Sequence, residues 1–191
     1  MTVQLLRRRE RQAGRGRSRR WRLAALATAV VAVFLAATAA LLVWPPQGMP
    51  ARVDAIFLLG GEGDRLPYGL ALARERHAPV LVVSTSTPIA TGSDKCVPRI
   101  PGVRVICFNP DPQSTQGEAE FAARLERRYH WKTVAIVAIA PQNIRVRIRF
   151  ARCINARIYV VNAPFASIDW PYQLAYQWGA LFKAVLLQRS C

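Results

Sequence analysis

The longest apolar run of the chain lies near its N-terminus, from Leu23 to Val43, and it contains no charged residue. At about 1.5 Å per residue a helix of this length spans about 30 Å, which is the thickness of the hydrocarbon core of a bilayer. Trp21 and Trp44 flank the run, and indole rings prefer the headgroup layer. Two prolines follow Trp44 and end the helix. The pattern predicts a transmembrane helix over residues 23–43.

The segment before this helix is rich in arginine, which predicts the orientation of the chain. Positive charge stays on the cytoplasmic side, so we expect the N-terminus inside and the rest of the chain outside. A cleaved signal peptide is the alternative, but its apolar region is usually about 7–15 residues long with a small-residue cleavage site at its end. Here the A-x-A pattern at Ala37 to Ala39 lies inside the run. Arg19-Arg20 faintly matches a twin-arginine export signal.

These observations predict a single-pass protein of the cell membrane with an extracytoplasmic C-terminal domain. The expected parts are a basic cytoplasmic tail over residues 1–22, the transmembrane helix over 23–43, a linker over 44–52 and the domain over 53–191.

Beyond the linker, short apolar runs alternate with segments of helical periodicity. Continuous apolar runs are typical of parallel strands that are covered on both faces. Strands are predicted over 53–59, 80–84, 103–107, 133–138 and 156–161. Helices are predicted over 67–76, 115–129 and 143–153, with an amphipathic closing helix over 172–187. The alternation predicts a three-layer, Rossmann-like α/β domain with a mostly parallel sheet of about five strands.

Candidate ligand-binding residues follow from the rule that such sheets bind ligands beyond the carboxyl ends of their strands. The first strand ends in Gly60 and Gly61, which allow close approach of the backbone, and Arg65 can clamp an anion; an ordinary tight turn is the alternative. The second strand ends in hydroxyl residues from Ser84 to Thr87, which can donate to phosphate or sugar, or simply cap the loop. No G-x-G-x-x-G fingerprint and no zinc-ligand spacing is present, so we expect no cofactor and no metal.

Two more strand ends add candidates. Thr115 and Glu118 have the spacing of a capping box at the start of the helix over 115–129, and an anion can also dock on that helix N-terminus. After the fourth strand, Gln142 and Arg145 stand at the start of the next helix, beside the predicted cleft.

Taken in order, these motifs resemble the YdcF-like family of the SanA and ElyC type, which is catalogued as domain-of-unknown-function family 218. The resemblance rests on V-D-A-I-F-L-L-G-G with a following arginine, S-T-S after the second strand, T-x-x-E-A at Thr115, and Y-H-W-K-T-V before the fourth strand. It covers about residues 52–162, and the closing helix fits as its tail. It implies a Rossmann-like domain, often anchored outside the cytoplasm, and a role in the integrity or biogenesis of the cell envelope.

The chain departs from the family pattern at one position. Family members usually begin the helix after the fourth strand with His-x-x-Arg-Ala, and here Gln142 stands at the histidine position while Arg145 is kept. Glutamine does not titrate near neutral pH, so a proton-transfer role at this position is lost. His77 and His130 precede strands, so we expect both on the surface at the opposite edge of the sheet.

Two functions are consistent with this pattern. The first is an envelope enzyme or binding protein for an anionic, phosphate- or glycan-bearing precursor, with Glu118 as general acid or base and the arginines holding the negative group. The second is a non-catalytic envelope assembly protein. The net charge is +16, but the exported topology and the lack of interleaved aromatic and basic residues argue against nucleic acid. Arg145, Arg149 and Arg152 fall on one helical stripe, which is either a solvated basic face near anionic lipid or part of the substrate site.

The four cysteines favour disulfides, because the predicted domain lies in an oxidising compartment. Cys96 lies in a loop just before the strand that holds Cys107, so that bridge is geometrically easy. Cys153 ends a helix, and a bridge to Cys191 would hold the last residue in place. We predict the pairs Cys96–Cys107 and Cys153–Cys191. A redox or nucleophilic cysteine is the alternative, but no C-x-x-C motif supports it.

Overall fold

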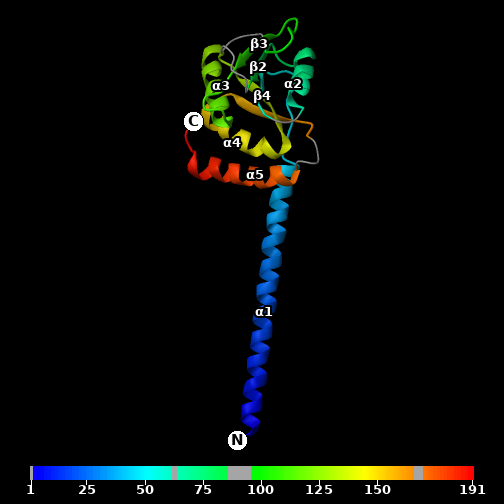
Figure 1. The fold of residues 1–191 in the computed structure, drawn as a ribbon, viewed down its shortest axis with the longest axis vertical. Coiled ribbons are helices and arrows are strands. Elements are labelled where there is room, and N and C mark those ends of the chain that lie inside the picture. Colours follow the sequence, from blue (N-terminus) through cyan, green and yellow to red (C-terminus); the bar gives the residue numbers. More distant parts are fainter. Residues whose placement is uncertain (1, 62–63, 86–95, 166–169) are drawn as a thin grey trace. The chain divides into compact units, whose positions relative to one another are not determined.

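The computed structural model describes residues 2–61, 64–85, 96–165 and 170–191, with side chains from residue 19 onward. The chain divides into two compact units, Met1–Ala40 and Leu41–Cys191. The first unit consists mainly of the helix α1 (Thr2–Thr38) (Figure 1). One π-helical turn, η1 (Ala39–Val43), follows α1 and crosses the boundary between the units. Among the described residues, the stretch Arg19–Val43 is long and apolar enough to cross a membrane, a criterion that a signal sequence also meets.

The second unit is built on a five-stranded sheet in which every described pairing is parallel. The strand order is β3-β2-β1-β4-β5, with β1 (Ala55–Leu58) at the centre (Figure 1). The other strands are β2 (Val80–Ser84), β3 (Arg104–Phe108), β4 (Thr133–Ile139) and β5 (Arg157–Ala163). The chain runs outward from β1 to β3 and then returns to the other side of β1, so the order reverses between β1 and β4. Such a switch point is where open α/β sheets bind ligands.

Helices cover both faces of the sheet, which confirms the three-layer α/β prediction. The helix α2 (Arg65–Arg74) packs Leu70 and Ala73 against one face. The helices α3 (Thr115–Tyr129) and α4 (Asn143–Cys153) cover the other face, with Phe121 and Phe150 in the core. A 3-10 turn, η2 (Ala140–Gln142), leads into α4. The closing helix α5 (Trp170–Phe182) continues as the π-helical η4 (Lys183–Leu187), and α5 contacts α4 (Figure 1).

The predicted element boundaries agree closely with those observed. The bounds predicted for β2, α3 and α4 are the bounds of the structure. The first strand is shorter than predicted because Val53, Asp54 and Leu59 lie outside the four residues of β1. The helix α2 begins at Arg65 and ends at Arg74, two residues earlier than predicted at each end.

The segment predicted as a linker is held against the domain by hydrogen bonds. The carbonyl of Pro46 accepts from Asn143 Nδ2 at 3.2 Å and from Arg147 Nη2 at 2.8 Å. The amide of Gly48 donates to the Val160 carbonyl of the edge strand β5 at 3.0 Å. The chain therefore joins the domain within a few residues of Val43.

Both predicted disulfides are present. Cys96 pairs with Cys107 of β3, and Cys153 at the end of α4 pairs with Cys191. The second bridge fixes the C-terminus against α4. Disulfides fit a domain that lies outside the cytoplasm.

Candidate functional site

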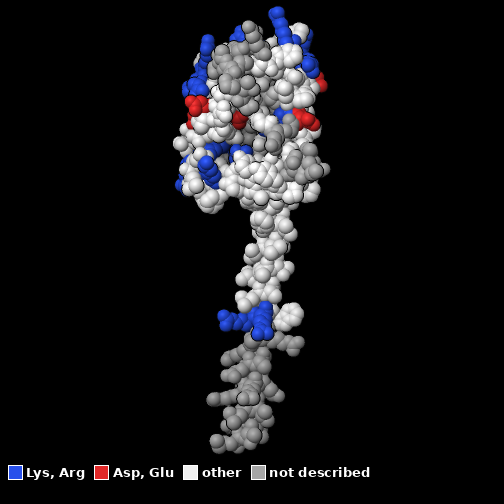
Figure 2. All heavy atoms as spheres, in the orientation of Figure 1, with Lys and Arg blue, Asp and Glu red and all other residues white. Residues whose placement is uncertain are grey.

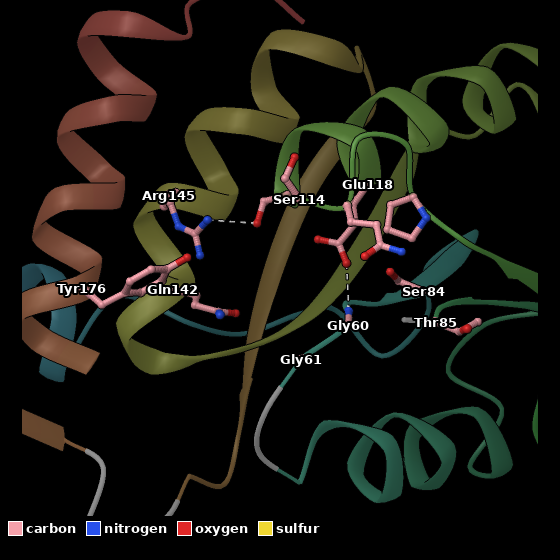
Figure 3. A pocket seen from close by; sticks show the side chains of 12 residues that line it. Gly60, Gly61, Ser84, Thr85, Ser114, Glu118, Gln142, Arg145 and Tyr176 are labelled. Atoms are coloured by element: carbon pink, nitrogen blue, oxygen red, sulfur yellow. Dashed lines mark hydrogen bonds between the residues drawn. The ribbon is translucent and has the colours of Figure 1, made fainter. Parts of the chain in front are cut away.

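A cavity of about 330 Å³ opens at the carboxyl edge of the sheet, at the switch point between β1 and β4 (Figure 3). Its volume lies at the lower end of the range of about 300–1,000 Å³ that is typical of small-molecule sites. All of the site residues predicted from the sequence line it, except Arg65. The full lining is Gly60, Gly61, Ser84, Thr85, Pro110, Gln113, Ser114, Thr115, Glu118, Gln142, Arg145 and Tyr176.

The loop after β1 combines a strained glycine with a buried arginine. Gly61 has φ of +103°, and a Cβ atom at this position would lie 2.7 Å from Nη2 of Arg65. The positive φ favours glycine, since other residues rarely adopt this backbone conformation, and any larger side chain would also displace the Arg65 guanidinium. Arg65 begins α2, is only 2% exposed, and donates from Nη1 to Oε1 of Gln142 at 2.9 Å. Arg65 lines an adjoining hollow rather than the cavity itself. Its hydrogen bond therefore positions the Gln142 side chain, although Arg65 does not line the cavity. Glu62 and Gly63 of this loop, and Ser86 and Thr87 after β2, lie outside the described residues.

Glu118 is the one carboxylate among the residues that line the cavity, and it is buried. Its Oε1 accepts a hydrogen bond from the Gly60 amide at 2.8 Å, which links α3 to the loop after β1 (Figure 3). Burial raises the pKa of this carboxyl above its ordinary value. The Gly60 amide, the Ser84 hydroxyl, Arg65 and Arg145 act in the opposite direction but do not outweigh the burial. The group is therefore easier to protonate than an exposed glutamate.

The capping box predicted at Thr115 and Glu118 is wrong, because Ser114 caps α3 instead. Ser114 has extended backbone, and its Oγ accepts from the Gly117 amide at 3.5 Å. The Glu118 carboxylate does not turn back to the cap, since it spans to Gly60. This first turn is tightly packed: a Cβ at Gly117 would lie 2.1 Å from the carbonyl oxygen of Pro112. Because Ser114 does the capping, the Thr115 hydroxyl accepts from Arg145.

Arg145, on the first turn of α4, approaches the cavity from the side opposite Glu118 and Ser84 (Figure 3). Its Nη1 donates to Oγ1 of Thr115 and its Nε to Oε1 of Gln177 of α5, each at 3.1 Å. Burial lowers the pKa of its guanidinium, while Tyr176 and Glu118 raise it and Arg149 lowers it further. An arginine nevertheless stays charged. Both of these acceptors are neutral, so the positive charge is available to an anion in the cavity.

The rest of the basic stripe does not form a solvated face, so that interpretation is wrong. Arg149 is 4% exposed and donates to the carbonyl and side-chain oxygens of Gln188. Arg152 donates from Nη1 to the carbonyls of Ala184 and Gln188 at 2.6 and 2.9 Å. These carbonyls end the closing helix, where cations are favourable. The two arginines therefore hold the C-terminal helix against α4.

Both histidines lie away from the cavity, at the amino edge of the sheet. His130 is exposed and ends α3 in a left-handed conformation. His77 is partly exposed and contacts the Ala51 carbonyl at 2.7 Å and the Glu75 carboxylate at 3.1 Å. Among the described residues, no three His, Cys, Asp or Glu side chains lie close enough to hold a metal ion.

Sequence reasoning missed Pro110, Gln113, Ser114 and Tyr176 of the cavity wall, and Gln177, which binds Arg145. Serine directly before a helix is the preferred cap, so Ser114 could have been found from the sequence. Gln177 and Gln173 stand at i and i+4 on an otherwise apolar helix, and such a pair indicates a buried polar contact. No sequence signal identifies Tyr176, because its place in the cavity wall depends on how α5 packs.

Comparison with protein-family models, with curated proteins and with solved structures finds no match for this chain. The chain has an α/β fold with a five-stranded parallel sheet of order β3-β2-β1-β4-β5 and one long apolar helix near its N-terminus.

Proposed function

We propose that this chain is a membrane-anchored extracytoplasmic protein of the YdcF-like type, which binds an anionic, phosphate- or glycan-bearing precursor of the cell envelope. The observation that carries the proposal is Arg145. It is a partly buried guanidinium at the wall of the cavity, held by two neutral acceptors, next to the N-terminus of α3. A helix N-terminus and an arginine together favour phosphate over neutral ligands.

The anchored topology is supported by the sequence and by the disulfides. The arginine-rich first part of α1, before residue 23, favours a cytoplasmic N-terminus, and the apolar stretch Arg19–Val43 then crosses the bilayer once. The two disulfides suit the oxidising side of the membrane.

The proposed chemistry is proton transfer by Glu118 next to an anion held by Arg145. Burial raises the pKa of Glu118, so the group can hold a proton at a higher pH than an exposed carboxyl can. In a hydrolytic step, Glu118 would give its proton to the leaving oxygen as the bond to the phosphorus or sugar carbon breaks. Water would supply the new oxygen and return one proton to the Glu118 carboxylate, and Arg145 would stabilise the developing negative charge.

A second candidate function is that of a non-catalytic envelope assembly protein, which retains the cavity but catalyses no reaction. It is favoured by Gln142, which stands where the resemblance leads us to expect a histidine and which accepts a hydrogen bond from Arg65. In this fixed position Gln142 cannot exchange a proton near neutral pH, although it can still contact a ligand.

Binding and catalysis can be tested separately in the full-length protein. Inorganic phosphate is titrated calorimetrically into the wild type, Arg145→Met and Arg127→Met in detergent, where Arg127 is an exposed control on α3. We expect Arg145→Met to weaken binding at least tenfold and Arg127→Met to leave it unchanged. Equal affinities in the three proteins would remove the basis of the proposal.

Glu118→Gln distinguishes an enzyme from an assembly protein. The variant is expressed in a strain that lacks the gene, and resistance of the envelope to detergent is measured. An enzyme loses its effect while the variant folds normally, whereas an assembly protein tolerates the change.

A further inference from the structure

The closing helix exposes many apolar side chains and buries two glutamines beside Leu181 and Ala184, which is unusual for a surface helix. Its buried positions include Gln173 at 6% and Gln177 at 0% exposure. Its exposed large hydrophobic side chains are Tyr172, Tyr176, Phe182, Val185, Leu186 and Leu187. An exposed apolar surface of this size on a domain marks an interaction site.

The inner hydrogen bonds fix this orientation of the helix. Gln177 accepts from Arg145 through Oε1 and donates from Nε2 to Oε1 of Gln173 at 3.2 Å. At the other end, Arg149 and Arg152 bind the last carbonyls, and the Cys153–Cys191 bridge follows directly. Rotating the apolar face inward would break these contacts and leave Nε of the partly buried Arg145 without its acceptor. The exposed apolar face is therefore a stable property of the folded domain.

The composition of the outer face matches the interfacial layer of a bilayer. Tyr172 and Tyr176 stack with their ring centroids 6.0 Å apart, and tyrosine rings prefer the level of the lipid headgroups. Lys183 is the one charged residue of Trp170 to Leu187, and a lysine at this depth extends its ammonium to the headgroups. Figure 2 shows that the surface over α5 is mostly free of charged side chains.

The path of the chain ties the domain to the end of the apolar stretch through a very short connection. The apolar stretch ends at Val43, and only Trp44 and Pro45 precede Pro46, whose carbonyl is bound by Asn143 and Arg147 of α4. Three residue steps reach at most about 10 Å. Hydrogen bonds then join Pro46 to side chains on the first turns of α4, so this end of α4 lies near the end of the span. The helix α5 packs on α4. The start of α4, and α5 packed on it, are thus tethered near the residue at which the apolar stretch ends.

We infer that the outer face of α5 and η4 docks in the headgroup layer of the bilayer that Arg19–Val43 spans, as an interfacial amphipathic helix. The inference rests on the anchored topology proposed above and not on the ligand of the cavity. Tyr176 belongs both to this face and to the wall of the cavity, so docking brings that side of the cavity to the level of the headgroups.

The test uses the full-length protein in nanodiscs of phosphatidylcholine and phosphatidylglycerol that contain lipids spin-labelled near the headgroup. An environment-sensitive fluorophore is attached through Phe182→Cys, and in separate samples through Arg127→Cys on α3 and Leu26→Cys in the span. We expect quenching at 182 and at 26 to exceed quenching at 127 several-fold. Adding Leu186→Asp and Leu187→Asp to the 182 sample should reduce its quenching to the level at 127, with an unchanged thermal midpoint because both leucines are exposed.

The outcomes separate the two proposals. Quenching at 26 but not at 182 overturns docking and leaves the anchor in place. Quenching at neither position overturns both. A blue-shifted but unquenched fluorophore at 182 that responds to the number of chains per nanodisc assigns the face to a second copy of the chain, which also overturns docking to lipid.

Discussion

Two carboxylates with opposite surroundings lie near the two ends of β1, and both are at least partly buried. At the amino end, Oδ2 of Asp54 accepts from the amides of Lys132 and Thr133 at 2.7 and 2.8 Å and from the Thr133 hydroxyl at 3.0 Å. These bonds tie the start of β1 to the start of β4. At the carboxyl end, Oε1 of Glu118 accepts from one backbone amide, that of Gly60.

The pKa values follow this difference. Burial raises the pKa of Asp54, but the hydrogen bonds from Lys132 and Thr133 outweigh it, and the pKa lies below its ordinary value. Burial of Glu118 is deeper and less compensated, so its pKa lies above its ordinary value. A carboxylate that is fully paired stabilises a fold, whereas one that is buried and under-paired at a cavity is a candidate for chemistry. The comparison separates the structural end of the sheet from its candidate functional end.

The largest change in stability is expected at the carboxyl end of the sheet, from crowding around Gly117. In Gly117→Ala the new Cβ would lie 2.1 Å from the Pro112 carbonyl oxygen, so the first turn of α3 must move. We expect a loss of about 3 kcal/mol in the free energy of unfolding, at the upper end of the usual cost of overpacking. Gly179→Ala in α5 is the matched control, because nothing lies within 4 Å of its Cβ. There the better helix propensity of alanine should raise stability by about 0.5–1 kcal/mol. Denaturant unfolding of the full-length variants measures both values, and equal effects would contradict the tight packing.

The second-largest change in stability is expected at the amino end of β1, at Asp54. Asp54→Ala removes the acceptor of three hydrogen bonds and leaves the Lys132 and Thr133 amides unpaired. We expect a loss of about 2 kcal/mol in the free energy of unfolding. Glu118→Gln keeps an acceptor for Gly60 and removes a buried charge, so its stability at neutral pH should equal or exceed that of the wild type. If Glu118→Gln were the more damaging of the two, the assignment of a structural and a functional end would be reversed.

The smallest predicted effect is on the pH dependence of stability. As pH rises, Asp54 at the amino end of β1 increases the free energy of unfolding, and Glu118 at its carboxyl end decreases it. The lowered pKa of Asp54 means that its contribution is present above the unfolded pKa of about 3.9 and is lost as pH falls through the folded value. The raised pKa of Glu118 means that stability is greatest below the unfolded pKa of about 4.3 and declines as pH rises through the folded value. Thermal unfolding from pH 3 to pH 8 should show the decline above pH 4 in the wild type and a smaller one in Glu118→Gln. An identical profile for both proteins would place the pKa of Glu118 at its ordinary value.

The fold was largely predictable because its signals are local. Buried parallel strands such as Val80–Ser84 are continuous apolar runs, and α3 and α4 show helical spacing between capping or polar residues. The grouping of Gly60, Ser84, Thr115, Glu118 and Arg145 also followed, because parallel strands bring their carboxyl ends to one edge.

What the sequence did not reveal depends on the direction of side chains in the packed structure. The same glutamate spacing fits a capping box or a bond to Gly60, and only the position of the β1 loop decides between them. The spacing of Arg149 and Arg152 shows a stripe, but whether it faces water or the C-terminal carbonyls depends on α5. The outward apolar face of α5 is likewise set by the need of Arg145 for Gln177.

The most direct test of the central claim is a crystal structure of the full-length protein grown with inorganic phosphate. The account predicts an anion at the carboxyl end of β1 and β4, within hydrogen-bond distance of the Arg145 guanidinium and of the first turn of α3. A cavity that stays without phosphate at a saturating concentration, or an anion bound only at the amino edge of the sheet, would contradict it.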